Sequence, residues 1–201
     1  KVTLDGRPLL WKNRDTDFMR NHVDYVKGEK YNFIAVVNSA NAYLKEAWMG
    51  TNSSGFALMN TQSYNLVDVK GDEERGAANG RVIYRALEVC ATVEDFCHFL
   101  DTISKPSDIE ANFGVIDAQG GAAMFEVDYY KYVMYDANNP KDAPYGYIAR
   151  TNFSFAGKVN EGAGYVRYME ADQVLMKALA TGSITPQFIF NDLSRSFRNR
   201  M

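Results

Sequence analysis

Residues 112–127, NFGVIDAQGGAAMFEV, decide the fold of this 201-residue chain. Two runs of β-forming residues, 112–117 and 122–127, flank the turn sequence Gln119-Gly120-Gly121. Runs of this kind joined by a short glycine-containing turn are typical of a β-hairpin, in which the two strands are antiparallel. The stretch therefore predicts an antiparallel sheet.

Further strand candidates lie on both sides of this hairpin. Upstream, the sequence predicts a hairpin over residues 2–12, which turns at Asp5-Gly6, and short strands at 31–38, 47–49, 56–61 and 66–69. Downstream, it predicts strands at 130–135 and 145–151, with a break at Asn138-Asn139-Pro140 between them. Most of these runs are rich in β-branched and aromatic residues, which favour half-buried strands.

Helices are predicted in two pairs. The first pair covers residues 81–91 and the run that begins at Thr92, where Asp95 completes a capping box. The second pair covers 167–180 and the run that begins with Thr185 as the N-cap before a proline. Because strands and helices are grouped rather than alternating, a doubly wound parallel sheet is disfavoured. We expect a single α+β domain over residues 1–201, with helices packed on antiparallel sheet.

The composition excludes several classes of function. Hydrophobic residues make up 46% and charged residues 23%, with a net charge of -3, so nothing indicates nucleic acid as a partner. No apolar run is long enough to span a membrane. Two cysteines (Cys90, Cys97) and two histidines (His22, His98) are too scattered for a zinc site, and we expect two small buried thiols. No metal or cofactor is implied, and the compartment is left open between cytoplasmic and periplasmic or secreted.

Four sequence motifs, taken in their order along the chain, indicate a known family. They are GRPLLWKNRD at 6–15, GTNSSGFALMN at 50–60, NFGVIDAQG at 112–120 and ARTNF at 149–153. Together they resemble the N-terminal-nucleophile hydrolases that include choloylglycine hydrolases, penicillin V acylase and the isopenicillin N acyltransferase group. The resemblance extends from about residue 4 to about residue 196. It implies a four-layer αββα sandwich, with two antiparallel sheets between helical layers.

The resemblance also implies a reaction. In this family, an N-terminal cysteine exposed by autocatalytic processing attacks a linear, non-peptide amide and forms a thioester. Its own α-amino group is the general base, which is chemically reasonable because the pKa of such a group is about 7.7–8.0. We expect this cysteine a few residues before Lys1, and a further portion of the domain after the C-terminal end shown. Thr3 could serve only if cleavage exposed it, and its spacing to Asp15 is too short.

Four residues correspond to the family's catalytic positions. The resemblance implies that Asp15 holds the amine and the thiol, and that Asn60 and Asn152 donate to the oxyanion. It implies that Arg167 completes the site.

Other interpretations of these positions stay open at this point. Asp15 could be a solvated turn residue, or it could form an Asp-x-Asp metal pair with Asp17. Arg150 competes with Arg167 for its role. Lys12 stands where the family has an arginine, so bidentate carboxylate binding at that position is in doubt.

The substrate is expected to be a small amide. The substrate-binding candidates are Trp11, Asn13, Met59 and Phe153, although the apolar members also suit the core. A penicillin, a bile-salt conjugate or an N-acyl amine would fit the family. The alternatives are an acyltransferase with an amine acceptor, and an inactive relative that binds a small amide or a protein. A homo-oligomer or a second processed fragment is left open as a partner.

Overall fold

A computed structural model describes residues 3, 6–66, 76–158, 162–182 and 184–195. These residues contain one seven-stranded antiparallel sheet, in which the strands follow one another in chain order. The strands are β1 (Asn21–Val26), β2 (Phe33–Asn38), β3 (Met49–Asn52), β4 (Ala57–Gln62), β5 (Ala111–Ile116), β6 (Ala122–Val127) and β7 (Tyr132–Asp136). The predicted α+β class and the predicted hairpin over 112–127 are confirmed.

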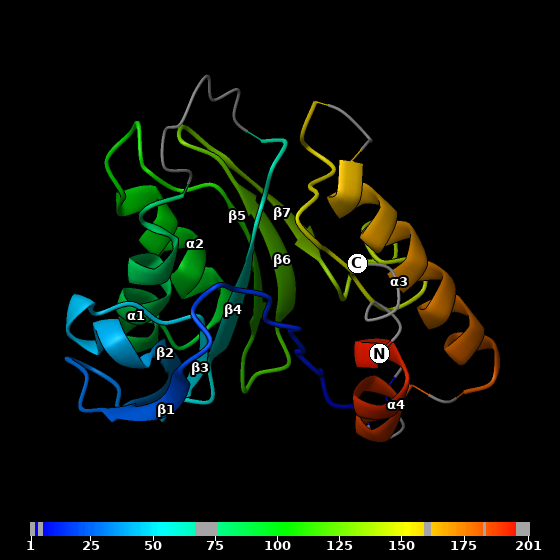
Figure 1. The fold of residues 1–201 in the computed structure, drawn as a ribbon, viewed down its shortest axis with the longest axis horizontal. Helices are drawn as coiled ribbons and strands as arrows, with labels where there is room; N and C mark the ends of the chain where they lie inside the picture. The colour runs from blue at the N-terminus through cyan, green and yellow to red at the C-terminus, as the bar shows by residue number, and fades with distance from the viewer. Residues whose placement is uncertain (1–2, 4–5, 67–75, 159–161, 183, 196–201) are drawn as a thin grey trace.

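The helices lie on both sides of the sheet (Figure 1). They are the 3₁₀ helix η1 (Ser39–Leu44), the α-helices α1 (Asn79–Val89), α2 (Val93–Thr102), α3 (Gly162–Ala180) and α4 (Pro186–Asn191), and the 3₁₀ helix η2 (Leu193–Arg195). Helices α1 and α2 cover one face, whereas α3 and α4 lie on the other side of the sheet. None of the helices in the described ranges has the length and hydrophobicity needed to cross a membrane.

Local signals place two of the helices. The Thr92 side chain accepts a hydrogen bond from the Asp95 amide, and the Asp95 carboxylate accepts one from the Thr92 amide, so the predicted capping box is confirmed. Helix α4 begins at Pro186 behind the Thr185 cap, also as predicted. Helix α3 begins at Gly162, one turn and more before the expected start.

The main core lies between the sheet and the helices α1 and α2. Phe96 of α2 is fully buried, and its ring contacts the rings of Phe56, Phe113 and Phe125 at centroid distances of 5.1–6.2 Å. Aromatic pairs at such distances add to the free energy gained from burial alone. This core fixes the positions of β4, β5 and β6, which supply the floor of the candidate site.

A second, smaller core holds the C-terminal helices together. Its buried members are Leu175, Ala178, Ile184, Ile189 and Leu193. The side chains of Trp11, Tyr147 and Ala149 pack against it. This cluster therefore joins α3 and α4 to the N-terminal segment and to the loop after β7.

The strand predictions were wrong in three places. The described residues 6–12 form no strand, and neither do residues 145–151. At the end of the second segment a side chain pairs with the backbone instead, since the Asn112 amide donates to the Thr151 carbonyl oxygen and, just beyond the segment, to that of Phe153. Strand β1 was missed because it is an edge strand with mostly exposed side chains, and its hydrophobic pattern is therefore weak.

Two other predictions are not covered by the described residues. Most of the strand predicted at 66–69 lies outside the described residues. The described ranges contain one sheet, so the second sheet of the expected sandwich is not seen in them.

Candidate active site

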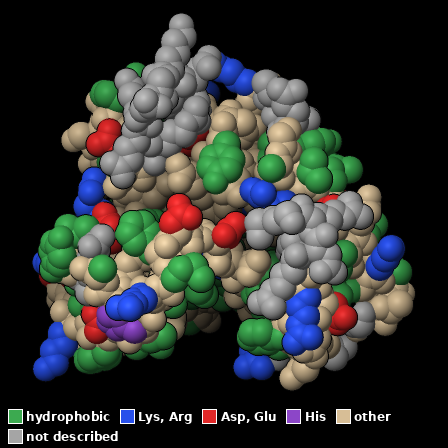
Figure 2. All heavy atoms as spheres, in the orientation of Figure 1, with side chains coloured by type: hydrophobic (Ala, Val, Ile, Leu, Met, Phe, Trp, Pro, Cys, Tyr) green, Lys and Arg blue, Asp and Glu red, His purple; other side chains and the backbone are tan. Residues whose placement is uncertain are grey.

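A cavity of about 810 Å³ lies on the side of the sheet that faces α3 and α4. Its walls come from the N-terminal segment 7–15, strands β4, β5 and β6, the loop 146–152, helix α3 and the residues around α4. In Figure 2 the surface is hollowed between the part of the molecule that carries β1–β4 and the part that carries α4. A volume of this size is typical of small-molecule sites.

Most of the predicted site residues meet in this cavity. Its lining includes Trp11, Asn13, Asp15, Met59, Asn60, Asn152 and Arg167, which come from four separate parts of the chain. Thr3, the first described residue, lines it as well. The roles of these residues in a reaction stay predictions, but the shared cavity is what a common site requires.

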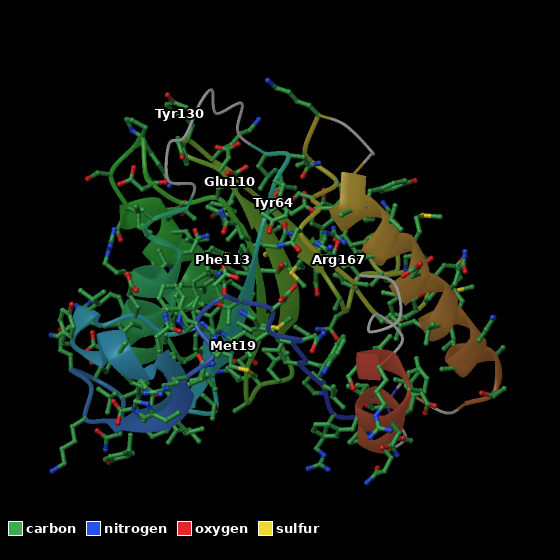
Figure 3. The ribbon with its side chains drawn as sticks, viewed as in Figure 1. Met19, Tyr64, Glu110, Phe113, Tyr130 and Arg167 are labelled. Carbon is green, nitrogen blue, oxygen red and sulfur yellow. The ribbon has the colours of Figure 1, made fainter. Side chains whose placement is uncertain are left out.

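Asn152 and Arg167 contact each other directly. Figure 3 shows Arg167 extending from α3 toward the sheet, and its guanidinium donates a hydrogen bond to Asn152 Oδ1. The Asn152 Nδ2 atom donates to the carbonyl oxygen of Gln62 at 2.9 Å and lies 3.5 Å from the Thr61 hydroxyl. Because a guanidinium only donates, the oxygen of the Asn152 carboxamide must face Arg167 and the nitrogen must face β4.

The close approach of α3 to the loop depends on a glycine. A Cβ atom at Gly164 would lie 2.8 Å from the carbonyl oxygen of Asn152. The Thr151 hydroxyl donates to the Gly164 carbonyl oxygen at 2.6 Å. The first turns of α3 are therefore held against the loop, which brings Arg167 within reach of Asn152.

Arg150, the competitor of Arg167, has a different position. It forms an ion pair with Glu126 in which the side chains are only 3% and 0% exposed. The Glu126 carboxylate also accepts hydrogen bonds from the backbone amides of Phe155 and Ala156 at 3.0 and 2.7 Å. The Arg150 guanidinium lies 4.0 Å from the Phe155 ring centroid. Arg150 thus fastens the loop to β6, and Arg167 is the arginine that contacts Asn152.

Asn112 is a supporting residue that the sequence interpretation missed. It is buried on β5, and its Nδ2 atom donates to the carbonyl oxygens of Thr151 and Phe153 at 3.0 and 3.1 Å. These two bonds bracket Asn152 and hold its backbone in place. A signal was present in the sequence, because an asparagine inside an otherwise apolar strand must find buried partners.

Lys12 is the second feature that was not foreseen. Its ammonium donates to Asn60 Oδ1 at 2.9 Å and to the Trp48 carbonyl oxygen at 3.1 Å. Burial, together with the nearby Arg14 guanidinium, lowers the pKa of Lys12 from 10.5 to about 7. The sequence marked this position only as a departure from the family arginine.

Asp15 is exposed at the cavity, on the same segment as Lys12. The segment is anchored by Arg14, whose guanidinium donates to Asn21 and, at 2.7 Å, to Asn38, and lies over the Trp48 ring. Across the part of the chain that the structure describes, no three His, Cys, Asp or Glu side chains are grouped as a metal site.

Phe153 is not among the residues that line the cavity. It is 2% exposed and packs against the rings of Phe155, Tyr165 and Tyr168 at centroid distances of 5.0–6.0 Å. Its contacts are therefore those of a core residue that binds α3 to the loop, and they correct the expectation that it contacts substrate.

Both cysteines are free thiols away from the cavity lining. Cys90 is buried as expected, and burial raises its pKa to about 12. Cys97 is partly exposed, and partial burial raises its pKa as well. Because the thiolate is the reactive form, neither cysteine is an activated nucleophile.

The chain is similar in sequence to one known protein family. The chain is a member of the N-terminal-nucleophile group anticipated from the sequence. The sequence model of the acyl-coenzyme A:6-aminopenicillanic acid acyl-transferase family matches residues 3–175, and the chain belongs to this family. A search of curated proteins gave no significant match.

Solved structures with similar folds include two kinds of enzyme. Penicillin V acylase from Agrobacterium tumefaciens is 18% identical, with a TM-score of 0.47 over 85% of this chain and 56% of that chain. A variant of conjugated bile acid hydrolase from Clostridium perfringens is 14% identical, with a TM-score of 0.44 over 87% of this chain and 64% of that chain. The chain thus spans between about half and two thirds of the length of these proteins.

Proposed function

We propose that this chain is the greater part of an amide hydrolase that cleaves a linear carbon–nitrogen bond other than a peptide bond. The observation that carries the proposal is the meeting of Asp15, Asn60 and Asn152 in one cavity with Arg167. The nucleophile would be an N-terminal cysteine that precedes Lys1. The position of Thr3 and of residues 7–15 in the cavity wall supports this arrangement, because it places the described N-terminal part of the chain at the site.

The residues support a definite sequence of steps. The α-amino group of the cysteine takes the thiol proton, and the thiolate attacks the amide carbon. The carboxamide N–H groups of Asn60 and Asn152 stabilise the oxyanion, which takes the place of the long 3.5 Å contact between Asn152 and the Thr61 hydroxyl, and Asp15 holds the protonated amine. The C–N bond breaks as the leaving amine takes the proton from the ammonium, which leaves a thioester. Water then attacks the thioester, gives its proton to the amino group and releases the acid.

The cavity also supports an apolar acyl group on the substrate. Trp11 and Met59 line it together with Ile148, Val166 and Leu175. Removal of such a group from water contributes about 25 cal/mol for each square ångström of buried apolar surface. The polar end of the cavity would then hold the amide, and the apolar walls would hold the acyl chain or ring.

A second candidate function is acyl transfer, because the family is named for an acyl-transferase. The same thioester would form, and an amine would replace water as the acceptor. Supplying 6-aminopenicillanic acid as the amine acceptor separates the two reactions, because an acyltransferase forms the new amide at the expense of the free acid, whereas a hydrolase releases the acid.

The test uses the protein produced from its complete reading frame. Mass spectrometry of the mature protein should find an N-terminal cysteine, and release of amine should be measured with penicillin V, a glycine-conjugated bile salt and an N-acyl amine. Asn152→Ala should lower kcat about a hundred- to a thousandfold. The matched control is Asn32→Ala at an exposed loop position just before β2. A mature chain without an N-terminal thiol or hydroxyl, or equal kcat values for the two variants, would refute the proposal.

A further inference from the structure

The two asparagines of the cavity share an arrangement that the family resemblance did not imply. The carboxamide oxygen of each accepts a hydrogen bond from a cation: Asn60 from the Lys12 ammonium at 2.9 Å, and Asn152 from the Arg167 guanidinium. The two cations come from different walls, one from the N-terminal segment and the other from α3. Each asparagine therefore has a cation of its own.

This arrangement has a physical consequence for both carboxamides. Ammonium and guanidinium groups only donate hydrogen bonds, so each fixes which end of the carboxamide carries the oxygen. Bonds to charged donors are about twice as strong as neutral ones, and they withdraw electron density from the amide. A carboxamide polarised in this way is a better N–H donor toward a developing oxyanion.

We propose that Lys12 is a positioning residue that acts through Asn60, orienting and polarising its carboxamide, and that loss of the Lys12 charge sets the upper pH limit of the site. The inference rests on the proposed amide hydrolysis for its kinetic consequence. This positioning role differs from a purely structural one, because the effect of Lys12 on Asn60 depends on the positive charge of the Lys12 side chain.

The surroundings of Lys12 decide when that charge is lost. On its own segment the charged groups of the cavity are Arg7, Arg14 and Asp15, and Arg14 is the neighbour that disfavours a second cation. The loop contributes Tyr147 and the Arg150 that is paired with Glu126, and α3 contributes Arg167 and Glu170.

Within the described ranges, no carboxylate forms an ion pair or hydrogen bond with the ammonium to offset the cost of burying it, and its hydrogen-bond acceptors there are Asn60 and the Trp48 carbonyl. The pKa of Lys12 consequently falls to about 7. Above neutral pH, Lys12 still donates to Asn60, but as a neutral amine.

The hydrogen bond from Lys12 to Asn60, called here the Lys12–Asn60 clamp, can be tested by nuclear magnetic resonance without measuring amide hydrolysis. The side-chain amide signals of Asn60 should shift with a midpoint near pH 7 in the unsubstituted protein and should not titrate in Lys12→Arg. The control Lys27→Arg, at an exposed position, should keep the titration. Asn60 signals that stay constant from pH 6 to 8.5 in the unsubstituted protein would overturn the inference.

Kinetics tests the consequence. We expect kcat for amide hydrolysis to fall about fivefold above pH 7, and Lys12→Arg, which stays charged, to abolish this fall while the ascending limb remains. The same alkaline fall in Lys12→Arg and in the unsubstituted protein would contradict the positioning role. If no variant hydrolyses any amide while the Asn60 titration is present, the proposed function fails and the Lys12–Asn60 clamp is supported.

Discussion

Removal of the Glu126 carboxylate should destabilise the protein by about 3–5 kcal/mol, the usual cost of leaving a buried charge without its partner. Three groups lose a hydrogen-bond acceptor in Glu126→Ala: the Arg150 guanidinium, which keeps its bond to the Ala149 carbonyl oxygen, and the backbone amides of Phe155 and Ala156. The Arg150 side chain is only 3% exposed, so water cannot replace the carboxylate without local opening. The expected loss is a large part of a typical total stability of about 5–15 kcal/mol.

Urea unfolding followed by circular dichroism measures this loss. The matched control is Arg81→Ala, which breaks the ion pair with Glu46 in which the arginine side chain is 55% exposed, and it should cost under about 1 kcal/mol. A double variant, Glu126→Ala with Arg150→Ala, should recover part of the loss, because it removes the uncompensated charge. If Glu126→Ala unfolds at the same urea concentration as the control, the reasoning about the buried pair is wrong.

Three further predictions concern the cavity walls. The free energy of unfolding of the unsubstituted protein, relative to that of Lys12→Met, should rise between pH 7 and 9 by at most about 1.4 kcal/mol per pH unit. The reason is that the unfolded lysine binds more protons than the folded one in that range. If urea titrations find a difference that does not change with pH, the lowered pKa is contradicted. Gly164→Ala should cost about 1–3 kcal/mol, since its Cβ would lie 2.8 Å from the Asn152 carbonyl oxygen, and a thermal melt that matches the unsubstituted protein would refute the close approach. Phe153→Ala should lose about 3–5 kcal/mol in chemical unfolding, and a change in KM without any loss of stability would restore a substrate-binding role for Phe153.

The parts of the fold that could be predicted from the sequence are those in which local chemistry and tertiary contacts agree. The hairpin around Gln119-Gly120-Gly121 and the capping box at Thr92 each depend on residues close together in the chain. Segments 6–12 and 145–151 read as strands by composition. The end of the second segment is instead held by a distant side chain, since Asn112 donates to the Thr151 carbonyl oxygen. Propensity alone carries no information about such partners.

The same distinction applies to the candidate site. The order of the motifs predicted Asp15, Asn60, Asn152 and Arg167 as site residues, and the fold places them around one cavity. The residues that hold them, among them Lys12, could not be recognised, because the role of a supporting group depends on which distant atom it touches. Phe153 was misjudged for a related reason: an aromatic residue next to a site residue can point into the cavity or into the core, and sequence does not distinguish the two.

The order of the strands has a consequence for how the site comes into being. Strands β1–β4 form one run of neighbouring hairpins and β5–β7 another, and residues 63–110, which include α1 and α2, separate the two runs. Their joining along β4 and β5 closes a long loop, which is entropically costly and comes slowly in folding. Asn60 lies on one side of this seam, whereas Glu126, which holds the Asn152 loop, belongs to the other. If only one of the two runs of strands were folded, the cavity would be incomplete. Reactivity at the cavity would therefore report that β4 and β5 have paired and that the whole domain has folded.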